Sequence, residues 1–186
     1  NVIDFPTGYA SGPDDYIAKG LQAYEQYKGE TLLDWTSAPH APYTVSDNTF
    51  RSILTYAEQL NVPIHTHLHE TQDEIRLSLQ SSGMRPIERF QQLGLLSPNL
   101  IAVHMAHLSD HEIKLVHEYG CHIAHCPSSN MKLASGLAPI APLLNQGVNV
   151  GLGTDGAASN NRLDMFEEMR LAALLAKATS GRADTL

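Results

Sequence analysis

Short apolar runs rich in β-branched residues alternate along this chain with longer segments whose apolar residues recur at helical spacing. The runs predict six strands, at Val2–Phe5, Leu32–Ala38, Val62–Leu68, Asn99–Val103, Cys121–His125 and Val148–Gly153. The longer segments predict helices at Asp14–Tyr27, Asp47–Leu60, Thr71–Gln80, Pro86–Leu93, Asp110–Tyr119, Ile140–Gln146 and Leu163–Ala178. Strands that are separated by helices are parallel, so we expect either an open doubly wound α/β sheet or part of a (β/α)8 barrel.

Polar residues at the predicted strand ends favour the barrel. His67, His104, His125 and Asp155 fall at or just after the C-terminal ends of four different strands, where barrel enzymes carry their catalytic groups. The segment Gly151–Gly156 lacks the third glycine and the helix start of a dinucleotide-binding loop. We therefore predict an α/β fold that is a partial (β/α)8 TIM barrel, because six strands are two fewer than the eight of a complete barrel of about 250 residues.

Charge and hydropathy limit the classes of partner. The formal net charge of -8, from 12 basic and 20 acidic residues, argues against a nucleic-acid or anionic membrane surface. No apolar run approaches the ~20 residues that span a bilayer. Cys121 and Cys126 would face opposite sides of a strand and form no disulfide, as in a reducing compartment. These features predict a cytoplasmic protein whose partners are small molecules or other proteins, with no nucleic-acid or membrane partner.

The densest polar feature is His65-Thr66-His67-Leu68-His69-Glu70. In an extended strand the three histidines share one face, so two or three imidazoles could approach one divalent ion such as Zn²⁺ or Fe²⁺. Glu70 follows directly and could move protons at such a site. Taken alone, a His-x-His pair is equally consistent with a strand end that binds no metal.

Two further clusters strengthen the metal interpretation. His104 ends the next strand, and Asp155 follows the last strand; a carboxylate and imidazoles from separate strands commonly hold one catalytic metal. By itself, Asp155 before Gly156 is as readily a helix cap or turn residue. His40, between two prolines, suits either a ligand contact or a solvent-exposed loop. The polar segment 127–133 suits either an active-site loop or a simple turn.

Four long motifs occur in a fixed order and together resemble a known family. They are His-Thr-His-Leu-His-Glu-Thr (65–71), Val-His-Met-Ala-His-Leu (103–108), His-Cys-Pro-Ser-Ser-Asn-Met-Lys-Leu-Ala-Ser-Gly (125–136) and Gly-Thr-Asp-Gly-Ala-Ala-Ser-Asn-Asn (153–161). The sequence resembles the amidohydrolase superfamily and, within it, the methylthioadenosine/S-adenosylhomocysteine deaminases. The resemblance implies a distorted (β/α)8 barrel, of which this chain supplies strands three to eight as one partial domain over 1–186. The family's small β-sandwich domain is expected to be absent from this chain.

The resemblance also implies an activity and roles for individual residues. The family hydrolyses the amino group of adenosine derivatives with one divalent metal, most often zinc, with iron or manganese as alternatives. His67 and Asp155 would be metal ligands, and Asp155 would double as a base. Glu70 would protonate the purine ring nitrogen, and His104 would polarise the attacking water. His40, Glu70 and Asp155 would contact the purine nucleoside, and the other two histidines of 65–69 would have supporting roles.

One departure from the family pattern concerns the metal. The family carries a further His-x-His on barrel strand one, which has no counterpart in these 186 residues. We therefore expect the isolated chain to bind metal weakly and to lack useful activity, whereas the complete protein is expected to be an active homo-oligomer. The alternatives are a related amidohydrolase, such as guanine deaminase or a chlorotriazine-type hydrolase, and a non-catalytic barrel module.

Overall fold

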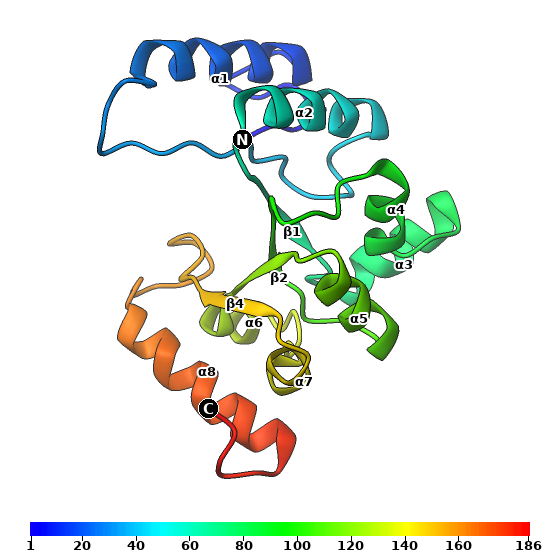
Figure 1. The fold of residues 1–186 in the computed structure, drawn as a ribbon, viewed down its shortest axis with the longest axis vertical. Helices are drawn as coiled ribbons and strands as arrows, with labels where there is room; N and C mark the ends of the chain where they lie inside the picture. Colours follow the sequence, from blue (N-terminus) through cyan, green and yellow to red (C-terminus); the bar gives the residue numbers. More distant parts are fainter.

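A computed structural model describes all residues from 1 to 186, in which one or two helices separate successive strands (Figure 1). The strands are β1 (Ile64–Leu68), β2 (Leu100–His104), β3 (His122–His125) and β4 (Asn149–Leu152). The helices are α1 (Pro13–Tyr27), α2 (Asp47–Leu60), α3 (Gln72–Ser82), α4 (Pro86–Leu93), α5 (Asp110–Glu118), α6 (Pro127–Lys132), α7 (Ile140–Asn145) and α8 (Met165–Ser180). None of these helices is both long enough and apolar enough to cross a membrane.

The four strands form one parallel sheet in the order β1-β2-β3-β4. The register aligns Thr66 with Ala102, Ala102 with Ile123, and Ile123 with Val150. Strand order that follows chain order is the arrangement of a (β/α)8 barrel, whereas a doubly wound sheet reverses its order at a switch point. Figure 1 shows α2, α4, α5 and α7 following one another around one side of the sheet. The prediction of a partial barrel is confirmed.

The first two predicted strands were wrong as extended strands. Val2 forms a single parallel bridge with Pro39, and Ser37 forms another with Ile64 at the start of β1. The segment around residue 38 therefore lies between Val2 and β1, as a barrel requires, but it is too short to be a strand. Pro39 and Pro63 lack the amide hydrogen that a longer ladder needs on either side of these bridges.

The predicted helices are present with boundaries within about two residues, and local side chains explain their ends. The Ser46 hydroxyl accepts a hydrogen bond from the backbone N–H of Thr49 at the start of α2, and Asn61 ends that helix in a left-handed conformation. Ser109 and Glu112 form a reciprocal capping box at the start of α5. Helix α6 was missed, because four of its six residues are polar and the segment carries no apolar periodicity, so it was interpreted as a loop or turn.

The core lies between one face of the sheet and the helices that cover it. Phe50 of α2 and Phe90 of α4 are fully buried and meet edge to face, with ring centroids 4.9 Å apart. On β1, Ile64, Thr66 and Leu68 are buried, whereas the two histidines between them are only partly buried. The alternation of side chains along β1 therefore turns these histidines to the face opposite the helices.

Candidate active site

The C-terminal edge of the sheet carries an unusual set of backbone conformations. His69 directly follows β1 with a φ of 53°, His104 ends β2 with a φ of 74°, and Asp155 follows β4 with a φ of 59°. A left-handed conformation is uncommon for residues other than glycine and costs about 1–3 kcal/mol each, and such residues cluster at functional sites. Three of them at the C-terminal ends of strands in one sheet mark this edge as the candidate site.

Three imidazoles lie next to one another at this edge, two of them stacked and the third edge-on. The rings of His67 and His104 are nearly parallel, with centroids 5.4 Å apart, and the ring of His40 meets that of His67 at 4.9 Å. The Nδ1 of His67 lies 2.6 Å from the carbonyl oxygen of His40. Because a carbonyl can only accept, Nδ1 carries the hydrogen, and Nε2 of His67 keeps a free lone pair.

His104 faces the carboxylate of Glu70. Its Nδ1 donates to Oδ1 of Asn130 at 2.8 Å, and its Nε2 lies 3.8 Å from Oε2 of Glu70. Burial lowers the pKa of His104, although the Glu70 carboxylate and the Asn130 hydrogen bond oppose this effect. A neutral His104 therefore directs an unprotonated Nε2 toward Glu70, at a distance too long for a direct hydrogen bond.

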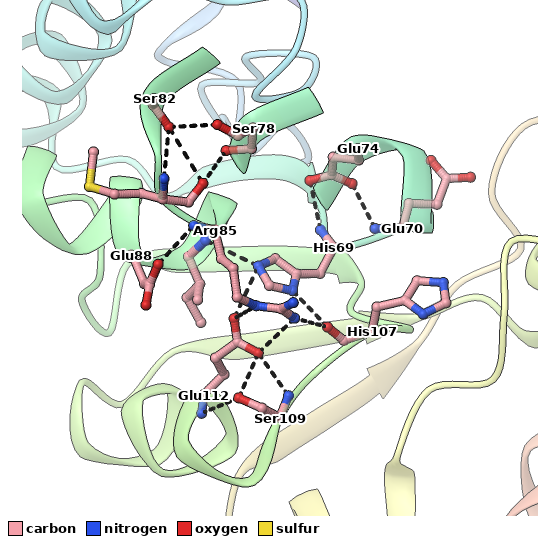
Figure 2. A network of polar contacts seen from close by, with 12 residues as sticks. His69, Glu70, Glu74, Ser78, Ser82, Arg85, Glu88, His107, Ser109 and Glu112 are labelled. Carbon is pink, nitrogen blue, oxygen red and sulfur yellow. Dashed lines mark hydrogen bonds and ion pairs between the residues drawn. The ribbon is translucent and has the colours of Figure 1, made fainter. Parts of the chain in front are cut away.

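Glu70 is held by its backbone and by its side chain. The buried carboxylate of Glu74 accepts hydrogen bonds from the backbone N–H groups of His69 and Glu70, at 2.9 and 2.8 Å (Figure 2). These bonds hold the strained turn that follows β1. The hydroxyl of Ser135 donates to Oε1 of Glu70 at 3.1 Å, so the other oxygen of Glu70 remains free to face His104.

His69 does not share the face of the other two histidines, so the prediction of three imidazoles on one face was wrong. Strand β1 ends at Leu68, and the left-handed backbone turns the His69 side chain into the protein, where it is fully buried. Its Nδ1 donates to the carbonyl of His107 at 2.9 Å, and its Nε2 accepts from the backbone N–H of Ile87 at 3.1 Å. His69 therefore has a structural role and is not available to a metal.

An ion pair between the partly exposed Arg85 and the buried Glu112 supports the same region. Arg85 donates to both oxygens of Glu112, at 2.6 and 2.9 Å, and to the carbonyl of His107 at 2.8 Å (Figure 2). The Nε2 of His107 in turn donates to the carbonyl of Ser135 at 2.5 Å. At Gly136 a side chain would come within 2.7 Å of the His107 ring, so this loop packs closely enough to require glycine. The network thus fixes the loop that presents Ser135 to Glu70.

Asp155 accepts three hydrogen bonds at the end of β4. Its Oδ2 accepts from the hydroxyls of Ser129 and Ser159, at 2.7 and 2.8 Å, and its Oδ1 accepts from the backbone N–H of Gly156 at 2.7 Å. Burial alone would raise the pKa of Asp155, but these hydrogen bonds outweigh it and hold the pKa below its usual value. Asp155 is therefore a carboxylate at neutral pH.

The structure thus brings His40, His67, Glu70 and His104 together through direct contacts. Asp155 is placed on the same edge and influences the pKa of His104, without a direct hydrogen bond to it. Sequence reasoning missed the polar residues that orient this set: Glu74, Ser129, Asn130, Ser135 and Ser159. Four of these five lie inside the long motifs at 125–136 and 153–161; nothing in the sequence singled out Glu74 from other helical glutamates.

The donor groups of this edge fit a divalent metal in their chemistry. His67 donates its Nδ1–H to a carbonyl and leaves Nε2 free, which is the usual orientation of a metal-binding histidine. Asp155 adds an ionised carboxylate with one oxygen that accepts only a single hydrogen bond. No three His, Cys, Asp or Glu side chains converge closely enough to hold a metal by themselves. His67 and Asp155 are therefore candidate ligands, and a complete metal site would need further donors.

The buried His125 at the end of β3 should make the stability of the fold depend on pH. Burial lowers the pKa of His125 from its usual 6.5 to about 4, with the nearby His104 acting in the same direction. Because the folded state resists protonation, stability is fully present above pH 6.5 and is lost as the pH falls toward 4. Each pKa unit corresponds to about 1.4 kcal/mol, so the loss from this residue reaches about 3 kcal/mol.

Urea unfolding between pH 7 and pH 4 checks this expectation. The variant His125→Gln, which cannot titrate, should lose about 3 kcal/mol less free energy of unfolding over this range than the wild type. His111→Gln, at an exposed position on α5, serves as the control and should follow the wild type. Parallel curves for the wild type and His125→Gln would contradict the assignment.

Comparison with known sequences places the chain among hydrolases. Residues 7–185 match the amidohydrolase family. A 5-methylthioadenosine/S-adenosylhomocysteine deaminase of Saccharophagus degradans is 47% identical over 185 residues, which cover 100% of this chain and 42% of that protein. A protein of the same name from Teredinibacter turnerae is 49% identical over 182 residues, covering 98% and 41%. The chain thus spans less than half the length of these relatives.

Solved structures show the same arrangement of strands and helices. A zinc-bound adenosine deaminase from Xanthomonas campestris has a TM-score of 0.97 and 48% sequence identity, covering 100% of this chain and 42% of that structure. A zinc-bound atrazine chlorohydrolase from Arthrobacter aurescens has a TM-score of 0.84 and 25% identity, covering 96% and 40%. Since the family match extends over nearly the whole length, this chain belongs to the amidohydrolase family.

Proposed function

We propose that this chain forms one part of a metal-dependent hydrolytic deaminase that acts on methylthioadenosine or S-adenosylhomocysteine. The observation that carries the proposal is the pairing of His104 Nε2 with the Glu70 carboxylate at 3.8 Å, beside the stacked ring of His67. This spacing leaves room for a reacting group that both side chains contact. The names of the relatives support the class of substrate.

In this proposal His67 and Asp155 hold a divalent metal together with donors from the rest of the protein. Zinc is the first choice, since imidazole and carboxylate ligands suit it and two related structures contain it. When bound, such a metal supplies a Lewis acid that lowers the pKa of water toward about 7. Asp155, His104 and Glu70 of this chain would then accept protons, orient the water and deliver protons.

The reaction exchanges the amino group of the purine ring for an oxygen atom from water. Asp155 is ionised and accepts a proton from the attacking water, while Nε2 of His104 orients that water through its lone pair. Glu70 delivers a proton to the ring nitrogen next to the carbon that is attacked. When the carbon–nitrogen bond breaks, the hydroxyl proton passes to the amino group, and ammonia leaves. The proton that Asp155 accepted passes on to Glu70, which returns both carboxyl groups to their starting states, so that one water is consumed and one ammonia is released.

In this proposal His40 contacts the nucleoside rather than the metal. Its Nδ1 is engaged by the hydroxyl of Thr44 at 2.8 Å, and its ring meets those of Tyr43 and His67. Burial lowers the pKa of His40, with His67 acting in the same direction. A neutral imidazole at this position offers Nε2 to a sugar hydroxyl of the substrate.

Ammonia release from the complete, zinc-loaded protein tests the proposal. Methylthioadenosine and S-adenosylhomocysteine should be turned over, whereas guanine and a chlorotriazine should not. The isolated 186 residues should show no useful activity, because they supply two ligands of the metal. Turnover of guanine or the triazine alone would favour the related hydrolases, and nucleoside binding without turnover would favour a non-catalytic module.

A further inference from the structure

Glu168 on α8 is a buried carboxylate that the proposed reaction does not use. It is fully buried, and its oxygens accept hydrogen bonds from the backbone N–H of Ser128 at 3.1 Å and from Nδ2 of Asn160 at 2.6 Å. Both donors are neutral, so Glu168 is not half of a buried ion pair. Burying a carboxylate is costly unless its hydrogen bonds are well made, which makes the partners of Glu168 the place to look for its role.

Both partners of Glu168 lead directly to Asp155. Ser128 precedes Ser129, whose hydroxyl donates to Oδ2 of Asp155 at 2.7 Å. Asn160 follows Ser159, whose hydroxyl donates to the same oxygen at 2.8 Å. Glu168 thus lies behind both of the hydroxyl groups that orient Asp155, although it does not contact Asp155 itself.

Asn160 also restrains the backbone next to Asp155. Its Nδ2 donates to the carbonyl of Thr154 at 2.9 Å, and its Oδ1 accepts from the backbone N–H groups of Arg162 and Leu163. The left-handed conformation of Asp155 persists only where surrounding contacts enforce it. Glu168 joins α6, this loop and α8 through one carboxylate, and so supplies the common anchor for those contacts.

We propose that Glu168 is a positioning residue for Asp155. By anchoring the segments that carry Ser129 and Ser159, it keeps Oδ2 of Asp155 engaged by two hydroxyl groups and leaves Oδ1, which accepts only the Gly156 N–H, available to the metal and water. The inference rests on the proposed role of Asp155 in metal binding. It assigns Glu168 a function through orientation, without contact with the substrate.

The variant Glu168→Gln in the complete protein tests this inference, because glutamine keeps the size but can serve only one of the two donors. Outer-shell substitutions typically cost 10–100-fold in metal affinity, so we expect a zinc affinity at least about tenfold weaker. The kcat for methylthioadenosine should fall by a similar factor while KM stays within about threefold. Glu167→Gln, at the neighbouring and more exposed position, should leave zinc affinity and kcat unchanged.

A double-mutant cycle separates positioning from general loss of stability. In an Asp155→Asn background, Glu168→Gln should change zinc affinity by less than about twofold, because its effect passes through Asp155. An equal loss in both backgrounds would overturn the inference. If Glu168→Gln fails to fold, Asn160→Ala interrupts the same connection and should show the same dependence on Asp155.

A crystal structure of Glu168→Gln provides a readout that needs neither metal nor turnover. We expect Asp155 to lose at least one of its hydroxyl contacts in the variant. If Ser129 and Ser159 both remain within hydrogen-bond distance of Asp155, the inference is wrong even where the deaminase activity is confirmed. Conversely, a wild-type protein without deaminase activity would refute the proposed function, while the displacement of Asp155 would still support the positioning role.

Discussion

Replacing Glu70 with glutamine should lower the kcat of the complete, zinc-loaded protein by a factor of about 10²–10⁴, the usual contribution of a positioned proton donor. Glutamine keeps the size of the side chain and can still accept the hydrogen bond from Ser135, but it cannot deliver a proton to the ring nitrogen. The KM for methylthioadenosine should change by less than about threefold, because the loss concerns the transition state. Steady-state ammonia release measures both constants.

Ser135→Ala is the matched variant for this experiment. It removes the hydroxyl that orients Glu70 and keeps the carboxylate, so kcat should fall by much less than in Glu70→Gln. Zinc affinity should be retained in both variants, because neither residue is a proposed ligand. A Glu70→Gln protein with a kcat within about threefold of the wild type would show that proton delivery has another source.

The sequence predicted the strands of the sheet correctly where alternating apolar runs ended at residues typical of turns, such as Gly, Pro, Asn or Asp. Strands β1 to β4 and most helices follow directly from alternating apolar runs, and Ser46 and Ser109 marked helix starts through their side chains. The two N-terminal runs failed as strands because a barrel strand also needs unbroken neighbours, and prolines interrupt the backbone there. Helix α6 was not predicted because it is formed by mostly polar residues that give no regular apolar spacing.

For the candidate site, too, some residues could be located from the sequence and others could not. His67, His104 and Asp155 could be located from sequence because parallel strands end at a common edge. The direction of each side chain could not, since the left-handed turn at His69 reverses an alternation that the sequence pattern continues. Glu74 and Glu168 were also invisible, because a buried helical glutamate is recognised only when its backbone and side-chain donors are seen. The roles of these two carboxylates are set by contacts between distant segments of the folded chain, which the spacing of residues in the sequence does not reveal.

The largest expected effect on stability comes from Arg85. In Arg85→Met, the carboxylate of Glu112, which is only 2% exposed, loses both hydrogen bonds from the guanidinium. Removing one partner of a buried pair typically costs about 3–5 kcal/mol, because the remaining charge is desolvated and unpaired. We expect a loss of this size in the free energy of unfolding at pH 7, measured with urea.

The double variant Arg85→Met/Glu112→Gln distinguishes the unpaired charge from lost packing. It should be more stable than Arg85→Met alone, because a neutral amide can still accept from Ser109 and no longer buries a charge. Equal stability of the single and double variants would assign the loss to packing of the arginine side chain instead.

Lowering the pH should reduce the difference in free energy of unfolding between Arg85→Met and the wild type. In the wild type, burial alone would raise the pKa of Glu112, but the hydrogen bonds from Arg85 and Ser109, together with the nearby His69, outweigh it and hold the pKa below its usual 4.5. The ion pair therefore stabilises the folded wild type above pH 4.5. This stabilisation is lost as the pH falls through the lowered pKa of Glu112. Without Arg85, burial raises the pKa of Glu112, so the variant recovers as its carboxylate is protonated. A gap that stays constant from pH 7 to pH 4 would mean that Glu112 is not charged in the folded protein.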